Sequence, residues 1–174
     1  MTGRVLVAGI GNIFLSDDGF GVEVTRRLQE RGGLPEGVEV VDTGICGRDL
    51  AYQLLDGYRA LVIVDATQRG GTPGTLYTLE HDLDAPRSGE ADLGGHSVDP
   101  LAMLDLLDGL VASMDIEAPV GRVLIVGCEP ETVDEGIGLS APVAAAVEPA
   151  VELVLDLTDQ LLENRTLTWE GTLQ

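Results

Sequence analysis

The sequence predicts an α/β domain in which helices cover a mixed, mostly parallel β-sheet. Three short runs rich in valine, at residues 5–8, 38–41 and 60–64, have the length and composition of buried strands. Helix-forming segments separate them, and this βαβαβ order is typical of parallel strands with helices on the sheet faces. A short glycine-rich connection then breaks the pattern, which indicates that the next strand runs in the opposite direction.

Two helices are expected between these first three strands. Residues 20–31 carry apolar side chains at four-residue spacing, and two glycines follow to end the helix. Residues 48–56 form a shorter helical segment that Gly57 closes. Each helix therefore joins two strands that run in the same direction.

The fourth strand, at residues 75–79, follows residue 65 after only about ten positions, which include two glycine-containing turn signals. A parallel crossover needs a dozen or more residues. We therefore expect this strand to be antiparallel to its neighbour and to lie at or near an edge of the sheet.

A polar segment at residues 80–97 holds both histidines of the chain, His81 and His96. Loops of this length in small domains are usually functional or disordered. A helix is expected at residues 98–108 and the last strand at residues 122–126.

The C-terminal region is expected to form a long helix over residues 141–162. Pro149 lacks a backbone N–H, so we expect a kink or a restart of the helix there. The length of the chain suits one domain with one sizeable core. We expect a single domain over residues 1–163 and a flexible tail over residues 164–174.

The charge and composition exclude several functions. The chain has 30 acidic and 10 basic residues, a formal charge of −20, so nucleic acid and anionic membrane surfaces are poor partners. The absence of lysine excludes a Schiff-base lysine and a P-loop lysine. The N-terminus lacks the pattern of a secretory signal, so we expect a cytoplasmic protein with reduced cysteines.

The first candidate site follows the first strand, where Gly9 and Gly11 form a G-x-G pattern. A dinucleotide fold would need a third glycine where Phe14 stands, and bare N–H groups where Asp17 and Asp18 enter the helix. Nucleotide binding is therefore a weak alternative. Capping of the helix by Asp17, or by the serine before it, would explain one carboxylate and leave Asp18 for another role.

Asp65 and His96 extend this candidate site. Asp65 ends the most hydrophobic strand, and residues just beyond parallel strand ends face the ligand crevice of open α/β sheets. A loop-capping role is the alternative for Asp65. His96 follows two glycines just before a helix and could be an exposed loop residue. If the first and third strands are neighbours, Asp18, Asp65 and His96 can form a metal site with an open position.

Other catalytic systems fit the sequence less well. It contains no HExxH motif and no GxSxG nucleophile elbow. Cys128 lies at the end of the last strand, and Cys46 has no nearby histidine in sequence. We interpret both cysteines as buried and inert.

Three segments together resemble the hydrogenase maturation endopeptidases over nearly the whole chain. They are VLVAGIGNIFLSDDGFGVEV at residues 5–24, VIVDA at residues 62–66, and GIGLSAPVAAAVEPAV at residues 136–151. The resemblance implies a three-layer helix–sheet–helix fold with a mixed, mostly parallel five-stranded sheet. It also implies an endopeptidase that removes the C-terminal extension of a nickel–iron hydrogenase large-subunit precursor after nickel insertion.

By position, the resemblance implies that Asp18, Asp65 and His96 are both the catalytic and the metal-contacting residues. The nickel would belong to the substrate and would serve the protease as a recognition handle. The expected partner is the large-subunit precursor, and the working expectation is a monomer. The sequence also allows two other functions, namely a non-catalytic checkpoint for the immature subunit and a nucleotide-binding oxidoreductase.

Overall fold

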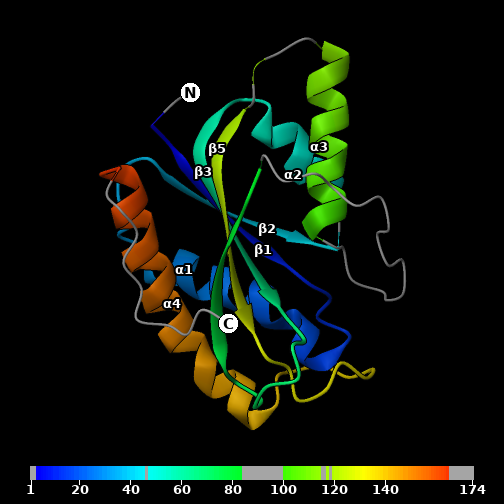
Figure 1. The fold of residues 1–174 in the computed structure, drawn as a ribbon. Helices are drawn as coiled ribbons and strands as arrows, with labels where there is room; N and C mark the ends of the chain where they lie inside the picture. Colours follow the sequence, from blue (N-terminus) through cyan, green and yellow to red (C-terminus); the bar gives the residue numbers. More distant parts are fainter. Residues whose placement is uncertain (1–2, 46, 84–99, 115–116, 118, 165–174) are drawn as a thin grey trace.

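The computed structural model describes residues 3–45, 47–83, 100–114, 117 and 119–164 (Figure 1). The strands are β1 (Val5–Ile10), β2 (Val38–Gly44), β3 (Tyr58–Ala66), β4 (Leu76–His81) and β5 (Val120–Cys128). The helices are η1 (Ser16–Gly19), α1 (Phe20–Arg31), α2 (Gly47–Leu54), α3 (Pro100–Met114) and α4 (Ala141–Leu162), where η1 is a single 3₁₀ turn.

The five strands form one sheet in the order β2-β1-β3-β5-β4. The pairs β1–β2, β1–β3 and β3–β5 are parallel, and β4 is antiparallel to β5 at the edge. The mixed, mostly parallel five-stranded sheet and its antiparallel edge strand are therefore confirmed. Because β1 and β3 are neighbours, their carboxyl ends meet at the same end of the sheet.

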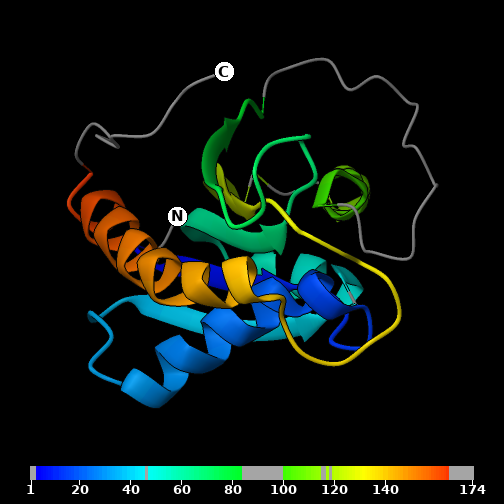
Figure 2. The same cartoon turned by 90° about the horizontal axis from the view of Figure 1, so that it is seen from below.

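Helices cover both faces of the sheet (Figures 1 and 2). One apolar cluster joins α1 and α4 to the sheet, and a second cluster joins α2 and α3 to the other face. The strands supply both clusters alternately, since Val62 and Val64 belong to the first and Leu61 and Ile63 to the second. The same alternation assigns Asp65 to the face that α2 and α3 cover.

The helices and strands differ from expectation mainly at their ends. Helix α1 and helix α4 have the expected bounds, whereas α3 continues to Met114 rather than to residue 108. Helix α4 runs through Pro149 without a break, so of the two expected outcomes, a kink or a restart, the restart was wrong. Val147 and Val151, on either side of Pro149, are both buried and hold this part of the helix against the sheet. None of the described helices is long and apolar enough to cross a membrane.

Candidate functional site

Two glycines allow the start of α1 to pack closely against the carboxyl ends of β1 and β3. A Cβ atom at Gly21 would lie 2.1 Å from the carbonyl oxygen of Val64 and 2.4 Å from that of Ile10. Gly11 has a φ of +143°, and a Cβ atom there would lie 1.8 Å from the carbonyl oxygen of Asp18. Only glycine allows such close backbone packing. This packing brings Asp18, in the turn η1 before α1, to the ends of both strands.

Asp17 is fully buried and fixes a distant loop to η1. Its carboxylate accepts hydrogen bonds from the backbone N–H groups of Glu131, Thr132 and Ser140, at 2.9, 3.1 and 2.7 Å, and from the Ser140 hydroxyl at 2.8 Å. Burial alone would raise the pKa of Asp17, but these hydrogen bonds outweigh it and the pKa is lowered. Asp17 is therefore held as a charged anchor.

The expectation that Ser16 or Asp17 caps the first helix was wrong. Neither η1 nor α1 has a side-chain hydrogen bond at its N-cap, and the N-cap residue of α1 is Gly19. The Ser16 hydroxyl donates to the backbone oxygen of Asp134 instead, at 2.9 Å. The inserted 3₁₀ turn moves both side chains away from the free N–H groups of α1, so they bond to the loop after β5.

Asp18 is also buried, but it accepts one hydrogen bond from the described residues. Its Oδ2 atom accepts the backbone N–H of Asn12 at 2.8 Å. Burial raises the pKa of the Asp18 carboxyl, and the Asn12 hydrogen bond only partly offsets that effect. A buried carboxylate with so few donors keeps lone pairs available for a cation.

Asp65 lies beside this turn at the end of β3. It follows Val64, whose carbonyl oxygen touches the start of α1, and it pairs in register with Gly127 of β5. Its side chain is buried, and its Oδ1 atom accepts the N–H of Ala66 at 2.8 Å. The structure therefore places Asp65 and Asp18 at the same end of neighbouring strands.

His96 lies outside the described residues, so its meeting with the two aspartates stays a prediction. It precedes α3 by four residues, since α3 begins at Pro100. The other end of α3, at Met114, leads into the start of β5, so the Pro100 end points toward the carboxyl ends of the parallel strands (Figure 1). Within the described part of the chain, no three acidic, histidine or cysteine side chains gather closely enough to hold a metal ion.

The family model described as "Hydrogenase maturation protease" matches residues 22–157. The Hydrogenase 2 maturation protease of Escherichia coli K12 is 33% identical over 153 residues, which cover 87% of this chain and 88% of that protein. The chain belongs to the hydrogenase maturation protease family. The matched region includes Asp65 and His96 and begins after Asp18.

Solved structures of family members have the same fold. The hydrogenase maturating endopeptidase HybD from E. coli superposes with a TM-score of 0.72 at 33% identity, covering 90% of this chain and 93% of that one. The [NiFe] hydrogenase maturation protease HybD from Thermococcus kodakarensis gives 0.67 at 27% identity, covering 89% and 99%. The protein is therefore a peptidase with the family's α/β architecture.

Cys128 is poorly placed to act as a nucleophile. The thiol forms no disulfide and is fully buried, which confirms the expectation that Cys128 is buried. Burial, together with the negative charges of Asp17 and Glu129, raises the pKa of the Cys128 thiol to about 12. The nucleophilic thiolate is therefore scarce at neutral pH. Cys46 lies outside the described residues.

Glu129 is a buried carboxylate that the sequence analysis missed. It follows β5 and accepts the backbone N–H groups of Arg69 and Gly70, at 2.9 and 3.0 Å, and the Tyr77 hydroxyl at 2.8 Å. Burial opposes ionisation, but these hydrogen bonds lower the pKa of Glu129 overall. They fix the connection that leaves Asp65 toward β4. In the sequence, the position of this glutamate directly after a strand could have indicated a residue with a structural or functional role.

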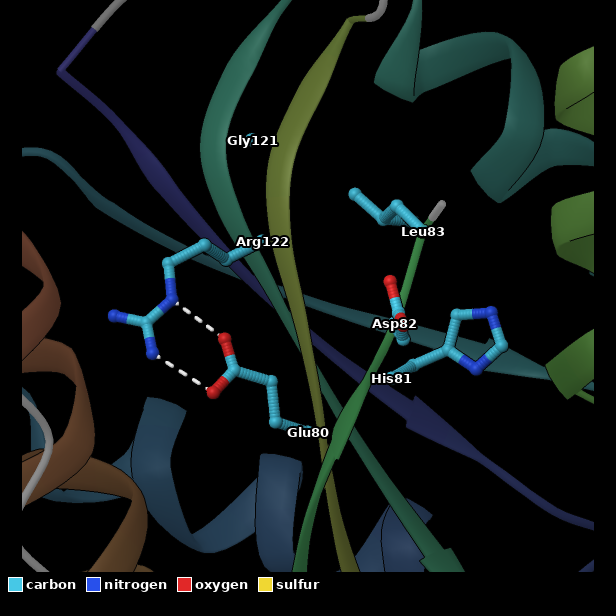
Figure 3. A pocket seen from close by; sticks show the side chains of 6 residues that line it. All are labelled: Glu80, His81, Asp82, Leu83, Gly121 and Arg122. Atoms are coloured by element: carbon cyan, nitrogen blue, oxygen red, sulfur yellow. Dashed lines mark hydrogen bonds and ion pairs between the residues drawn. The ribbon is translucent and has the colours of Figure 1, made fainter. Parts of the chain in front are cut away.

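His81 lies in β4 and not in the polar loop where it was expected. It lines a pocket with five neighbours, namely Glu80, Asp82, Leu83, Gly121 and Arg122 (Figure 3). Its ring points away from the Arg122–Glu80 ion pair, and its buried Nε2 atom has no hydrogen-bond partner among the described residues.

This pocket is remote from the candidate site. His81 pairs with Val123, whereas Asp65 pairs with Gly127 on the same strand. Four residues of strand separate these two positions by about 13 Å. The pocket therefore lies toward the opposite end of the sheet and adds no group to the two aspartates.

Proposed function

We propose that this protease removes the C-terminal extension of a nickel–iron hydrogenase large-subunit precursor after nickel insertion. The relative from T. kodakarensis is named for [NiFe] hydrogenase maturation, which supports this class of substrate. The observation that carries the proposal is the pair of buried aspartates, Asp18 and Asp65, at the ends of adjacent parallel strands. Ligands of open α/β sheets bind at this end.

In this proposal the nickel is part of the substrate. Asp18, Asp65 and His96 contact it, supplying two carboxylates and one imidazole. Three ligands leave the coordination shell incomplete, so the remaining positions belong to the ligands that the precursor already provides. The protease then reads whether nickel has been inserted, because a nickel-free precursor offers the aspartates no cation.

The environment of Asp18 suits this role. Its pKa is raised by burial, which means that the buried surroundings disfavour the negative charge of the carboxylate. A divalent cation offsets that penalty, because it favours the charged form of the carboxylate. Binding of the metallated precursor therefore stabilises the charged form of Asp18 in a way that the nickel-free precursor cannot.

The test is incubation with nickel-loaded and nickel-free precursor, followed by intact-mass measurement. The chain has two histidines, which gives a matched pair of variants. We expect wild-type protein and His81→Ala to release the C-terminal extension from the nickel-loaded precursor only. We expect His96→Ala to release none.

Two results would contradict this proposal. Cleavage by His96→Ala at the wild-type rate would show that the histidine is not part of the site. Equal cleavage of nickel-free precursor would show that nickel is not recognised. A stable complex with the nickel-loaded precursor and no loss of mass would favour the non-catalytic checkpoint.

A further inference from the structure

Large apolar side chains are exposed at the end of the sheet that carries the candidate site. Of the seven such residues in the described part of the chain, five follow the carboxyl ends of strands, and the other two, Tyr52 and Met114, lie on helices. The five are Ile13 and Phe14 after β1, Ile45 after β2, and Val133 and Ile137 after β5. Phe14 and Ile137 are 62% and 81% exposed.

The loops after β1 and β5 are built as one unit. The N–H of Gly136 donates to the carbonyl oxygen of Phe14, and the N–H of Ser16 donates to that of Gly136, both at 2.9 Å. Leu15 and Gly136 thus form a parallel bridge, and the two loops run side by side (Figure 2). The buried Asp17 carboxylate holds the same loop at residues 131 and 132. The exposed apolar side chains therefore stand on an ordered support.

This support continues directly into the candidate site. The N–H of Asn12 donates to Asp18, and the next residue is Ile13. A Cβ atom at Gly19 would lie 3.2 Å from the Cα atom of Ile13, so this residue rests on the turn that carries Asp18. We call the exposed side chains of Ile13, Phe14, Val133 and Ile137 the paired-loop surface.

We propose that the paired-loop surface docks an apolar segment of the precursor beside its nickel centre. This inference rests on the proposed function and names the surface that delivers the substrate. Apolar side chains rimmed by charged ones typically mark protein–protein contacts. The exposed acidic residues Glu131, Asp134 and Glu135 lie in the same loop as Val133 and Ile137, so we expect the docked segment to carry basic residues at its flanks.

A matched pair of double variants tests the surface. Phe14→Gln with Ile137→Gln removes two of its side chains, and Tyr52→Gln with Met114→Gln removes exposed apolar groups elsewhere. We expect the first pair to raise KM and the dissociation constant for nickel-loaded precursor about tenfold or more, with kcat unchanged. We expect the second pair to behave as wild type. Ile137→Gln alone, at the most exposed position, should give a smaller rise with no change in Tm.

The outcomes separate this inference from the proposed function. Wild-type protein that binds the precursor without cutting it contradicts the proposed function, and the dissociation constants still test the surface. If the Phe14 and Ile137 variants cleave the precursor with unchanged KM and dissociation constant, the docking role of the paired-loop surface is overturned and the proposed function stands. Wild-type self-association that these variants abolish, with unchanged precursor binding, assigns the surface to a second copy of the chain and overturns the inference.

Discussion

Asp17 and Asp18 are neighbours in one turn, yet their surroundings are opposite. Asp17 accepts four hydrogen bonds from the loop after β5, and its pKa is lowered. Among the described residues Asp18 accepts one hydrogen bond, from Asn12, and its pKa is raised by burial. Both are buried, so the difference comes from the donors around them and not from exposure to water.

The comparison distinguishes a carboxylate with a structural role, Asp17, from a candidate for binding substrate, Asp18. Asp17 has a donor for nearly every lone pair and gains nothing from a further partner. Burial of Asp18 has a cost that its hydrogen bond from Asn12 only partly offsets. Such an incompletely compensated group at the end of the sheet is a candidate for binding substrate. The anchor beside it fixes the turn and so fixes the position of Asp18.

The largest effect on stability should come from Asp17→Ala. This change leaves three partly buried backbone N–H groups without their acceptor, and each such loss costs up to about 1–3 kcal/mol. We expect the free energy of unfolding to fall by about 3 kcal/mol, measured with urea. Glu135→Ala, an exposed carboxylate in the bonded loop, should change it by less than about 0.5 kcal/mol. Equal denaturation midpoints for Asp17→Ala and wild type would refute the anchor.

Asp18→Asn should lower activity rather than stability. It keeps the shape of the side chain and removes the charge, so we expect the fold to persist. Loss of residues that merely support metal ligands costs 10- to 100-fold in activity, so loss of a contact to nickel should lower kcat/KM by about 100-fold or more. Cleavage rates of nickel-loaded precursor measure this effect. Wild-type kinetics in Asp18→Asn would show that this carboxylate does not contact the nickel.

A smaller effect should appear in the pH dependence of stability. Because the pKa of Asp17 is lowered on folding, its ionised carboxylate stabilises the folded state at pH values above the unfolded pKa of about 3.9. This stabilisation is lost as pH falls through the pKa of Asp17 in the folded state. Because the pKa of Asp18 is raised on folding, its effect on stability has the opposite pH dependence. The stabilisation from its protonated form is fully present below about pH 3.9 and is lost as pH rises through the pKa of Asp18 in the folded state.

The two asparagine variants should therefore diverge with pH. The destabilisation caused by Asp17→Asn should shrink in acid, whereas Asp18→Asn should gain stability relative to wild type as pH rises toward neutrality. Urea unfolding at a series of pH values measures both trends. Parallel trends in the two variants would show that the carboxylates share one environment.

The sequence predicts the scaffold well because hydrophobic periodicity is local. The bounds of α1 follow from four-residue spacing and the glycines after Arg31, and the antiparallel β4 follows from the short connection before it. The positions of Asp18 and Asp65 at strand ends follow from the same patterns. The placement of these two residues therefore needed only the order of elements.

The sequence could not reveal the anchor, because its partners are remote. Asp17 lies more than a hundred positions from Ser140, and locally it has the features of a helix cap. His81 was assigned to a loop because its neighbours are acidic, but pairing of β4 with β5 extends the strand to it. Glu129 likewise depends on donors about sixty positions away. Contacts of this kind are set by tertiary packing rather than by local sequence.

Asp18, Asp65 and His96 are proposed to contact nickel held by the precursor. Nickel-edge X-ray absorption of the precursor, alone and frozen with the protease before turnover, tests this contact most directly. We predict additional oxygen and nitrogen ligands at about 2 Å on complex formation, fewer with Asp18→Asn or His96→Ala, and the full number with His81→Ala. An unchanged nickel spectrum in a complex that goes on to cleave the precursor would contradict the account.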